Sequence, residues 1–255
     1  MVIEVLKFTW YGTNSFKLYD ENNSILIDPF IRYDKRKDIK YYQIFTKEKN
    51  ILITHGHIDH ILDIPSLYKD RKCNIYCLKT IYKRLSKRGI SKDNLNEIHY
   101  NDYFNIKDFN ITVYKSKHIK FDLKLIIDTT FNKRTIKYFK NLLYLGYNHI
   151  KNPLKKSIVS YYVKYKNKTI FIMGSMNLDE NIEYPKYMDY LIIAYQGRSD
   201  LDKKINTILQ KLEPKKVILT HFDDSFPPIS SSVNINWIKS KKNVIIPEYE
   251  KSIDL

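Results

Sequence analysis

The chain has 255 residues and a mass of 30.7 kDa, which corresponds to roughly one to two domains. Hydrophobic residues make up 43% of it and aromatic residues 14%, enough for a sizeable core, so the composition excludes a chain that is disordered throughout. No apolar run approaches the roughly 20 residues of a membrane span, and the first ten residues lack the basic and uninterrupted apolar segments of a secretory signal.

The formal charge of +16 has two explanations. It can reflect selection for an anionic partner, or a lysine-rich composition that makes the whole surface basic. Only seven of the 44 basic residues are arginine, the residue that usually binds phosphate in a fixed geometry, so the second explanation is favoured. We therefore expect any binding of nucleic acid to be weak and nonspecific.

Of the two cysteines, Cys73 directly precedes a predicted strand over residues 74–78 and Cys77 lies within it. On an extended chain their Cα atoms lie ~13 Å apart, whereas a disulfide requires about 7 Å or less. A C-x3-C pair without further cysteines is also a weak zinc site. We predict free thiols and a reducing compartment, the cytoplasm.

The first half of the chain predicts strands followed by helices. Apolar-rich or alternating runs separated by turn residues predict strands over 3–10, 15–19, 24–28, 50–54 and 74–78. A helix is expected from Asp59, with Asp63 as the cap of its next segment and Pro65 in the first turn. Another helix is expected over 80–88.

The second half alternates strands and helices again. Strands are predicted near Ile98 and Phe104 and over 111–114, 157–165, 169–173, 190–194, 217–220 and 244–246. Helical patterns cover 134–145, 203–212 and 233–238. This order predicts an α/β protein with mixed sheets and helices outside, as a single domain over residues 1–255 in which 120–155 is an elaboration.

The most informative stretch is Thr54-His55-Gly56-His57-Ile58-Asp59-His60, directly after an apolar strand. On an extended chain His55 and His57 point to the same side, so both can bind one metal ion. If the chain then turns into a helix, Asp59 and His60 lie beside them and supply ligands to a second ion. Imidazole and carboxylate groups are suitable zinc ligands.

Two further histidines follow predicted strands. His118 comes shortly after the strand over 111–114, and His221 directly follows the strand over 217–220. Because active sites of α/β proteins gather at the carboxyl ends of strands, we expect both to lie near the motif.

With these residues the chain resembles the metallo-β-lactamase superfamily of metal-dependent hydrolases. The H-x-H-x-D-H motif is matched in full, and the resemblance runs from residues 10–15 through 25–30 to 221–224. It is greatest to the branch of ascorbate-6-phosphate lactonase-like and N-acylphosphatidylethanolamine phospholipase-like proteins.

The resemblance implies an αββα sandwich, two mixed sheets flanked by helices, with zinc at one edge. The first zinc would be held by His55, His57 and His118. The second would be held by Asp59, His60 and His221. A water or hydroxide between the ions would be the nucleophile, and Asp28 would support the ligands from behind.

One position departs from the family. In most members the residue at Ser175 is an aspartate that bridges both metals, and a serine removes one charge and one ligand from each site. We expect one tightly bound zinc and a weaker second site. Asn177 and Asp179 are close enough in sequence to be substitutes, but a loop position and a helix cap are the favoured interpretations. With a single ion, Asp59 would be available as a general base.

Three functions are compatible with these residues. The favoured one is a zinc-dependent hydrolase of an anionic small molecule, with a phosphodiester or a lactone or ester bond. A nuclease and a metal-binding module without catalysis are the alternatives, and an iron-dependent oxidoreductase is disfavoured because His57 is not a glutamate. Candidates for lining the groove are Lys117, Lys120, Tyr195, Asp223 and Asp224. The substrate and the oligomeric state do not follow from the sequence.

Overall fold

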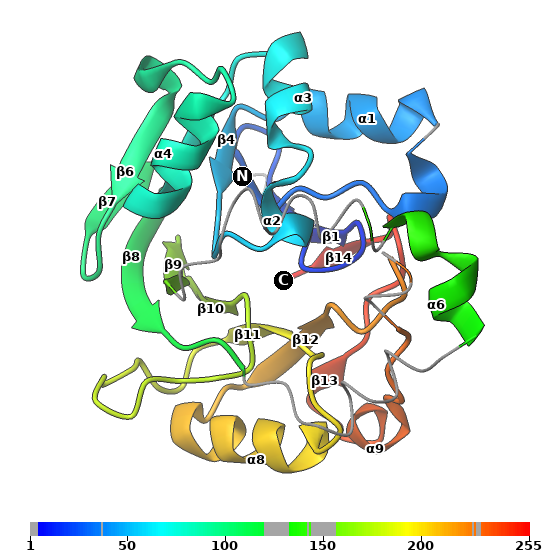
Figure 1. Ribbon diagram of the computed structural model, residues 1–255. Coiled ribbons are helices and arrows are strands. Elements are labelled where there is room, and N and C mark those ends of the chain that lie inside the picture. Colours follow the sequence, from blue (N-terminus) through cyan, green and yellow to red (C-terminus); the bar gives the residue numbers. More distant parts are fainter. Residues whose placement is uncertain are drawn as a thin grey trace.

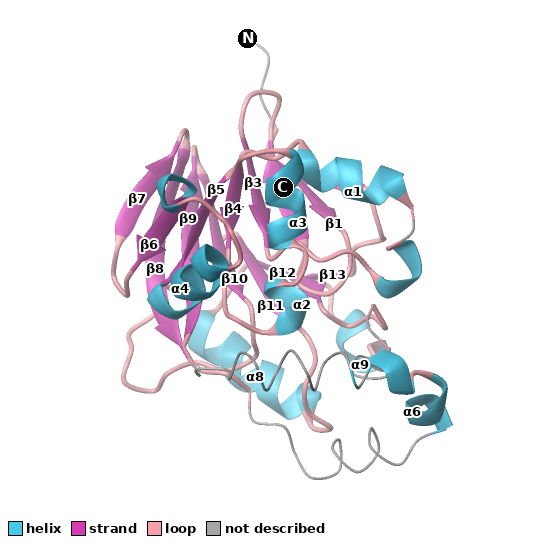
Figure 2. Cartoon of the chain, turned by 45° about the horizontal axis from the view of Figure 1, so that its top comes forward, coloured by secondary structure: helices cyan, strands magenta, loops and turns pink. Residues whose placement is uncertain are grey.

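The structure is a computed structural model that describes residues 5–36, 38–119, 133–141, 143, 157–225, 227 and 231–255. Within these residues, fourteen strands form two seven-stranded sheets (Figures 1 and 2). In each sheet three neighbouring pairs are antiparallel and three are parallel, so both sheets are mixed.

The first sheet has the order β14-β1-β2-β3-β4-β5-β6. Its antiparallel part joins the last strand of the chain to the first three, and its parallel part begins where β4 adds to β3. In the order of the sheet its strands are Ser252–Asp254, Lys7–Trp10, Phe16–Tyr19, Ser24–Ile27, Asn50–Leu52, Asn74–Leu78 and Leu95–Ile98.

The second sheet has the order β13-β12-β11-β10-β9-β8-β7. Its parallel part is at the β13 end, and its antiparallel part extends from β10 to β7. In the order of the sheet its strands are Val244–Ile245, Lys216–Thr220, Tyr190–Ala194, Lys168–Met173, Ile158–Tyr165, Phe109–Ser116 and Tyr103–Ile106.

Alternation along the strands explains how the layers pack. In β11, Tyr190 and Ile192 belong to the core shared by the two sheets, whereas Leu191 and Ile193 face the core beneath helix α8. Successive side chains of a strand point to opposite faces, so a strand that is apolar at every position is buried on both sides. The second sheet is therefore covered by the first sheet on one face and by helices on the other.

Helices cover the outer faces (Figures 1 and 2). α8 buries an apolar stripe at helical spacing, formed by Leu201, Ile205, Ile208 and Leu212. The helices near the first sheet are α1 (Ile39–Thr46), α2 (Ile58–Ile61), α3 (Ile64–Asp70) and α4 (Lys79–Lys87), with the short turns η1 (Tyr33–Lys35) and η2 (Lys92–Asn94). The others are α6 (Lys133–Lys137), α8 (Leu201–Leu212) and α9 (Asn236–Lys239). This is the αββα sandwich expected from the resemblance.

Most predicted elements are present with shifted ends. The predicted strand over 3–10 is shorter, because β1 begins at Lys7, and the last helix occupies 236–239 rather than 233–238. β14 is not expected from the sequence, since three residues are too few for a recognisable pattern. Of the elaboration over 120–155, which includes Lys120, only residues 133–141 and 143 are among those described.

Asp63 differs from its predicted role. It precedes α3, but its side chain makes no capping hydrogen bond to the helix. Instead its carboxylate accepts hydrogen bonds from the Ile31 amide at 2.8 Å and from the Arg36 guanidinium at 2.7 Å. A guanidinium is a stronger partner for a carboxylate than a neutral amide is, so Asp63 ties the loop after β3 to α3.

Both cysteines have free, buried thiols, as predicted. Burial raises the pKa of Cys73 to about 11 and that of Cys77 to about 12. Among the described helices, none combines the length and the hydropathy that a membrane-spanning helix requires.

Candidate metal centre

The H-x-H-x-D-H motif lies where the two sheets meet. The chain leaves the carboxyl end of β4 through Ile53 and Thr54 and enters the motif. The Thr54 carbonyl accepts a hydrogen bond from the Val159 amide at 3.0 Å, and His55 forms an isolated bridge with Ile158 at the start of β9. Residues from both halves of the chain can therefore reach the motif.

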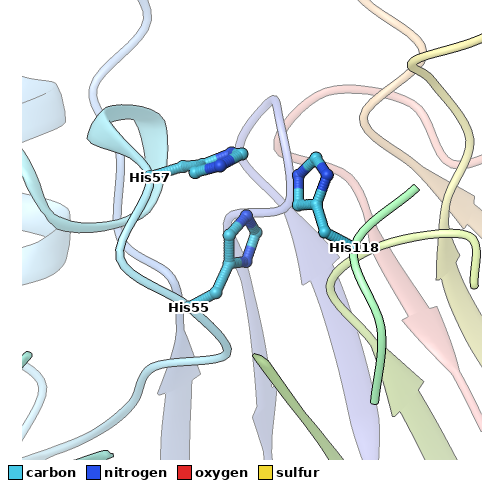
Figure 3. A group of neighbouring side chains, drawn as sticks. All are labelled: His55, His57 and His118. Atoms are coloured by element: carbon cyan, nitrogen blue, oxygen red, sulfur yellow. The ribbon is translucent and has the colours of Figure 1, made fainter. Parts of the chain in front are cut away.

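The first cluster, which we call triad 1, consists of His55, His57 and His118 (Figure 3). One ring nitrogen of each lies within 4.8 Å of the others, and the rings point toward one another. Burial and the neighbouring histidines lower the pKa of His55 well below its usual value, and that of His57 to about 3. Burial also lowers the pKa of His118. All three rings are therefore neutral at pH 7, the form in which imidazole binds metal.

Hydrogen bonds fix which nitrogen of these rings carries the proton. The Thr54 hydroxyl donates its single proton to Asp28 at 2.6 Å, so at 3.0 Å it accepts from Nδ1–H of His55. Nδ1–H of His118 donates to the Ile119 carbonyl at 2.5 Å. In both rings the lone pair is therefore on Nε2, the atom that is available to a metal ion.

The second cluster, triad 2, consists of Asp59, His60 and His221. Oδ2 of Asp59 lies 2.8 Å from Nε2 of His221 and 3.6 Å from Nε2 of His60. Burial alone raises the pKa of Asp59, but His60 and His221 outweigh it and hold that pKa well below its usual range. Triad 2 therefore contains a carboxylate, whereas triad 1 consists of neutral rings.

The two triads are contiguous. The rings of His55 and His60 are 3.9 Å apart between centroids, and those of His60 and His221 are 5.8 Å apart. The structure thus brings together all six residues that the sequence and the resemblance predict as ligands, from three segments of the chain. Their role as ligands stays a prediction.

Asp28 supports this arrangement from behind, as the resemblance implies. It is fully buried at the end of β3, and Oδ2 accepts a hydrogen bond from Nδ1–H of His60 at 2.7 Å. The same oxygen accepts from the hydroxyl of Thr54, and Oδ1 accepts from its amide at 2.8 Å. One carboxylate therefore orients a ring of each triad: His60 directly and His55 through Thr54.

Asn14 extends this network to the C-terminal half and is not predicted from the sequence. Its side-chain amide is fully buried, donates to Asp28 at 2.8 Å and accepts from the Thr220 hydroxyl at 2.8 Å. Thr220 directly precedes His221. In the sequence, Asn14 is recognisable only as a polar residue in the turn between β1 and β2. A turn asparagine alone does not indicate which residues it contacts.

The turn between β1 and β2 also holds His221. The Thr13 carbonyl accepts a hydrogen bond from the His221 amide at 2.7 Å, and the Thr13 amide donates one to the Asp223 carboxylate at 3.0 Å. Thr13, Asp28 and His221 all have left-handed backbones, with φ of 43°, 43° and 60°. Non-glycine residues take this conformation at a cost, and such residues concentrate at functional sites.

Ser175 lies beside triad 1. It is buried, and its hydroxyl accepts a hydrogen bond from the Ile119 amide at 3.0 Å, next to His118. A Cβ on the preceding Gly174 would lie 2.2 Å from Oγ1 of Thr54, so the backbone there requires glycine. The serine thus holds the loop that carries His118.

Neither alternative residue after Ser175 belongs to a triad. The side-chain amide of Asn177 donates to the His118 carbonyl at 3.3 Å. Asp179 is buried and forms ion pairs with Lys115 and Lys117 at 3.1 and 3.0 Å. Both residues therefore lie in a loop outside the triads. The expected helix cap at Asp179 is wrong, because a turn and not a helix follows it.

The candidates for lining the groove have other partners. Lys117 pairs with Asp179, and Asp224 forms an ion pair with Arg134. Tyr195 is fully buried and its hydroxyl donates to Asp202 at 2.7 Å, so it lines no groove.

Arg84 is a further residue near triad 1 that the sequence does not indicate. It lies on α4, and its guanidinium donates to the Gly56 carbonyl, between His55 and His57, at 3.0 Å. A Cβ on Gly56 would meet Ile81 of the same helix at 3.5 Å. α4 therefore packs against the motif loop and places a positive charge there.

The donor set fits divalent metal ions. Each triad offers three nitrogen or oxygen ligands. Nδ1 of His60 is hydrogen-bonded to Asp28, so in the neutral ring the lone pair is on Nε2, which faces the Asp59 carboxylate. A positive charge stabilises two such facing lone pairs. Consistently, the pKa of His60 is raised above its usual value. Burial by itself would lower this pKa, but the carboxylates of Asp28 and Asp59 outweigh that effect. Nδ1 of His221 is buried without a hydrogen-bond partner among the described residues.

Comparisons with known proteins agree with this fold. A UPF0173 metal-dependent hydrolase of Rhizobium johnstonii is 31% identical over 90 residues, which cover 34% of this chain and 38% of that protein. The match thus spans well under half the length of this curated relative. Igni18, a metallo hydrolase from Ignicoccus hospitalis, shares the fold over 98% of both chains, with a TM-score of 0.67 and 16% identity.

A second solved structure is the Zn²⁺-bound PqqB of Methylobacterium extorquens, with a TM-score of 0.61 and 11% identity over 94% of this chain and 87% of that one. The family model of the beta-lactamase superfamily domain matches residues 23–222. This range includes all six residues of the two triads, but not Asn14, which supports them. The match covers most of the chain, and the resemblance inferred from the motif is confirmed. The chain belongs to the beta-lactamase superfamily.

Proposed function

We propose that the protein is a metal-dependent hydrolase that binds zinc in triad 1 and a second, weaker ion in triad 2. The observation that carries this proposal is the contiguity of two partly buried triads, each with one histidine oriented by the shared carboxylate of Asp28. Zinc is supported by the nitrogen-rich donor set of triad 1, since three imidazoles leave the fourth tetrahedral position to water.

A bound divalent ion would lower the pKa of a water molecule toward 7 and polarise the bond to be cleaved. The protein contributes fixed ligand positions: Asp28 keeps Nδ1 of His60 occupied, and Thr54 does the same for His55. Asp59 is ionised at neutral pH and carries the negative charge of the centre. Its lowered pKa favours a role as ligand over the predicted alternative role as general base, because a weakly basic carboxylate accepts a proton poorly.

The proposed substrate is an anionic small molecule with a phosphodiester or a lactone or ester bond. The six ligand side chains contribute one formal negative charge, from Asp59, against the positive charges of one or two divalent ions. Arg84 adds a positive charge near the motif loop. An excess of positive charge in a partly buried site favours the binding of anions.

Metal analysis of the natively purified protein, paired with hydrolysis of bis(p-nitrophenyl) phosphate and a panel of lactones and esters, tests the proposal. We expect at least one equivalent of zinc per chain and turnover of one class of substrate. Bound metal without turnover of any substrate would instead support a metal-binding module. Absence of metal would contradict the proposed centre itself.

A nuclease is the second candidate, and the net charge of +16 is the observation that favours it. Lysine-rich surfaces bind nucleic acid weakly, with an affinity that falls as salt rises. We expect this weak binding and no cleavage. Nanomolar binding to a defined RNA at physiological salt, with cleavage, would make the nuclease the favoured function.

We also propose that residues 1–255 are a single domain that works in a reducing compartment, the cytoplasm. The support for the first point is the pairing of β1 with β14, which joins residues near both ends of the chain. The support for the second is the pair of buried free thiols.

A further inference from the structure

Helix α6 lies at the periphery of the molecule (Figures 1 and 2). The segment 133–143, which begins with this helix, carries exposed apolar side chains with lysines beside them. The segment begins with α6 and continues in helical conformation at residues 139–141 and 143. A turn at Tyr138 separates the two helical parts. Ile136, Phe139 and Leu143, the apolar stripe, are spaced as i, i+3 and i+7, the spacing of side chains that share one side of a helical segment. Their exposed fractions are 81%, 56% and 59%.

The opposite face of the segment is attached to the body of the protein. Arg134 forms an ion pair with Asp224, and the Asn141 side chain donates to the Pro227 carbonyl at 2.7 Å. The Tyr138 ring packs edge-on against Tyr33 at 6.2 Å between centroids. These contacts fix the segment to the loop that follows His221, so the apolar stripe faces away from the protein.

The charge beside the stripe has one sign. Lys133, Lys137 and Lys140 are exposed, and residues 133–143 contain no aspartate or glutamate. At 100° per residue, these lysines lie along one edge of the apolar stripe. Of the exposed aliphatic and phenylalanine side chains among the described residues, three of five are in this one segment.

We propose that the segment 133–143 docks the protein on an anionic lipid surface. A helix with large apolar side chains on one face and lysines beside them lies in the plane of a bilayer, with the apolar side chains in the acyl boundary and the lysines near anionic headgroups. A purely apolar stripe would fit a protein partner equally well, but the row of lysines without acidic residues complements a negatively charged surface. Docking here would hold the loop that follows His221 close to the lipid, since the segment is tied to that loop.

Sedimentation of the protein, residues 1–255, with lipid vesicles tests this proposal. We expect the wild type to sediment with phosphatidylserine-containing vesicles but not with pure phosphatidylcholine, and less so as salt rises. Phe139→Glu, which places a charge in the stripe, is expected to lower the partition coefficient by at least about tenfold. Tyr103→Glu is the matched control, because Tyr103 is 64% exposed on β7, and it should bind like the wild type.

A second variant separates loss of folding from loss of docking. Phe139→Trp keeps the stripe apolar and should shift its emission to shorter wavelength on addition of phosphatidylserine vesicles, whereas Tyr103→Trp should not. Equal binding by wild type and Phe139→Glu would overturn the proposal. So would a wild type that ignores vesicles and forms a dimer that Phe139→Glu dissociates, or one that binds RNA but not vesicles. Each readout is independent of hydrolysis.

Discussion

Triad 1 and triad 2 lie side by side but differ in charge and in how they are assembled. Triad 1 consists of three rings with lowered pKa values, two of them from one loop. Triad 2 contains the carboxylate of Asp59 and a histidine with a raised pKa, and it depends on His221 from the other half of the chain. Triad 1 therefore offers neutral ligands to a cation. Triad 2 contains a carboxylate, so it attracts positive charge before any metal binds.

This difference indicates where each triad is vulnerable. The rings of triad 1 make their direct hydrogen bonds to sequence neighbours, His55 to Thr54 and His118 to the Ile119 carbonyl. Triad 2 is supported by long-range contacts, through Asp28, Asn14 and the turn at Thr13. We expect substitutions in triad 1 to weaken metal binding by removing ligands. We expect substitutions of residues far from triad 2 in sequence, such as Asn14, to lower the metal affinity of triad 2.

The largest expected effect is the loss of triad 1. His57→Ala removes one of three ligands, so the variant should lose most of its bound zinc and at least about a hundredfold in hydrolysis. Metal per chain and turnover are measured on the same preparation. His99→Ala is the control, since His99 is an exposed histidine outside both triads. A variant that keeps a full equivalent of zinc would disprove this ligand assignment.

A carboxylate at Ser175 should make the two triads more alike. Ser175→Asp adds negative charge next to His118, which should strengthen binding of the weaker ion by about 1.5–3 kcal/mol. Titration calorimetry on metal-free protein measures both sites. Ser175→Asn has nearly the same shape without the charge and should show no such gain. Two equally tight zinc ions in the wild type would show that another group already bridges them.

Removing Asn14 should weaken triad 2 more than triad 1. Asn14→Ala deletes the link between Asp28 and Thr220, and loss of such supporting partners typically costs 10–100-fold in metal affinity. The same titration should show a weaker second ion and a nearly unchanged first one. Asn23→Ala, which changes another buried turn asparagine away from the triads, controls for general destabilisation. Equal weakening of both ions would mean that Asn14 acts on stability alone.

The smallest effect concerns pH. The pKa of His57 is about 3 in the folded protein and about 6.5 when unfolded, so between these values the unfolded state binds the extra proton. The free energy of unfolding of metal-free protein should therefore fall as pH drops below about 6.5, by about 1.4 kcal/mol per pH unit for each such histidine.

Urea unfolding at several pH values measures this slope. His57→Gln should reduce the slope by about one histidine's share. His60 has the opposite sign: its raised pKa stabilises the protein at low pH, and that contribution is lost as pH rises through the raised value. An unchanged slope in His57→Gln would contradict the assignment of His57 as a buried neutral ring.

The sequence predicted which residues gather at the centre better than it predicted the supporting network. His55, His57, Asp59 and His60 form one motif, and His118 and His221 each follow a strand, so local pattern and strand ends placed them near one another. Their division between two ions came from the resemblance and stays a prediction. In the supporting network, the hydrogen bond between Asn14 and Thr220 joins residues more than 200 positions apart. Nothing in local periodicity encodes such a contact, and only the folded arrangement of the sheets reveals it.

Errors in the fold prediction have a similar cause. Asp63 has the spacing of a helix cap, but Arg36 competes for its carboxylate across the loop. β14 is too short to recognise and is stabilised by pairing with β1. In both cases a tertiary partner, absent from any local window, decides the conformation.

The pairing of β1 with β14 also orders events during folding. Lys7 pairs with Asp254, so one edge of β1 stays open until the end of this sequence has been synthesised. An unpaired edge is a template for association with other chains. Contacts between such distant residues form slowly because the loop they close is long. The first sheet is therefore most prone to aggregation while the chain is still incomplete on the ribosome, and a chaperone that shields the edge of β1 would act in that interval.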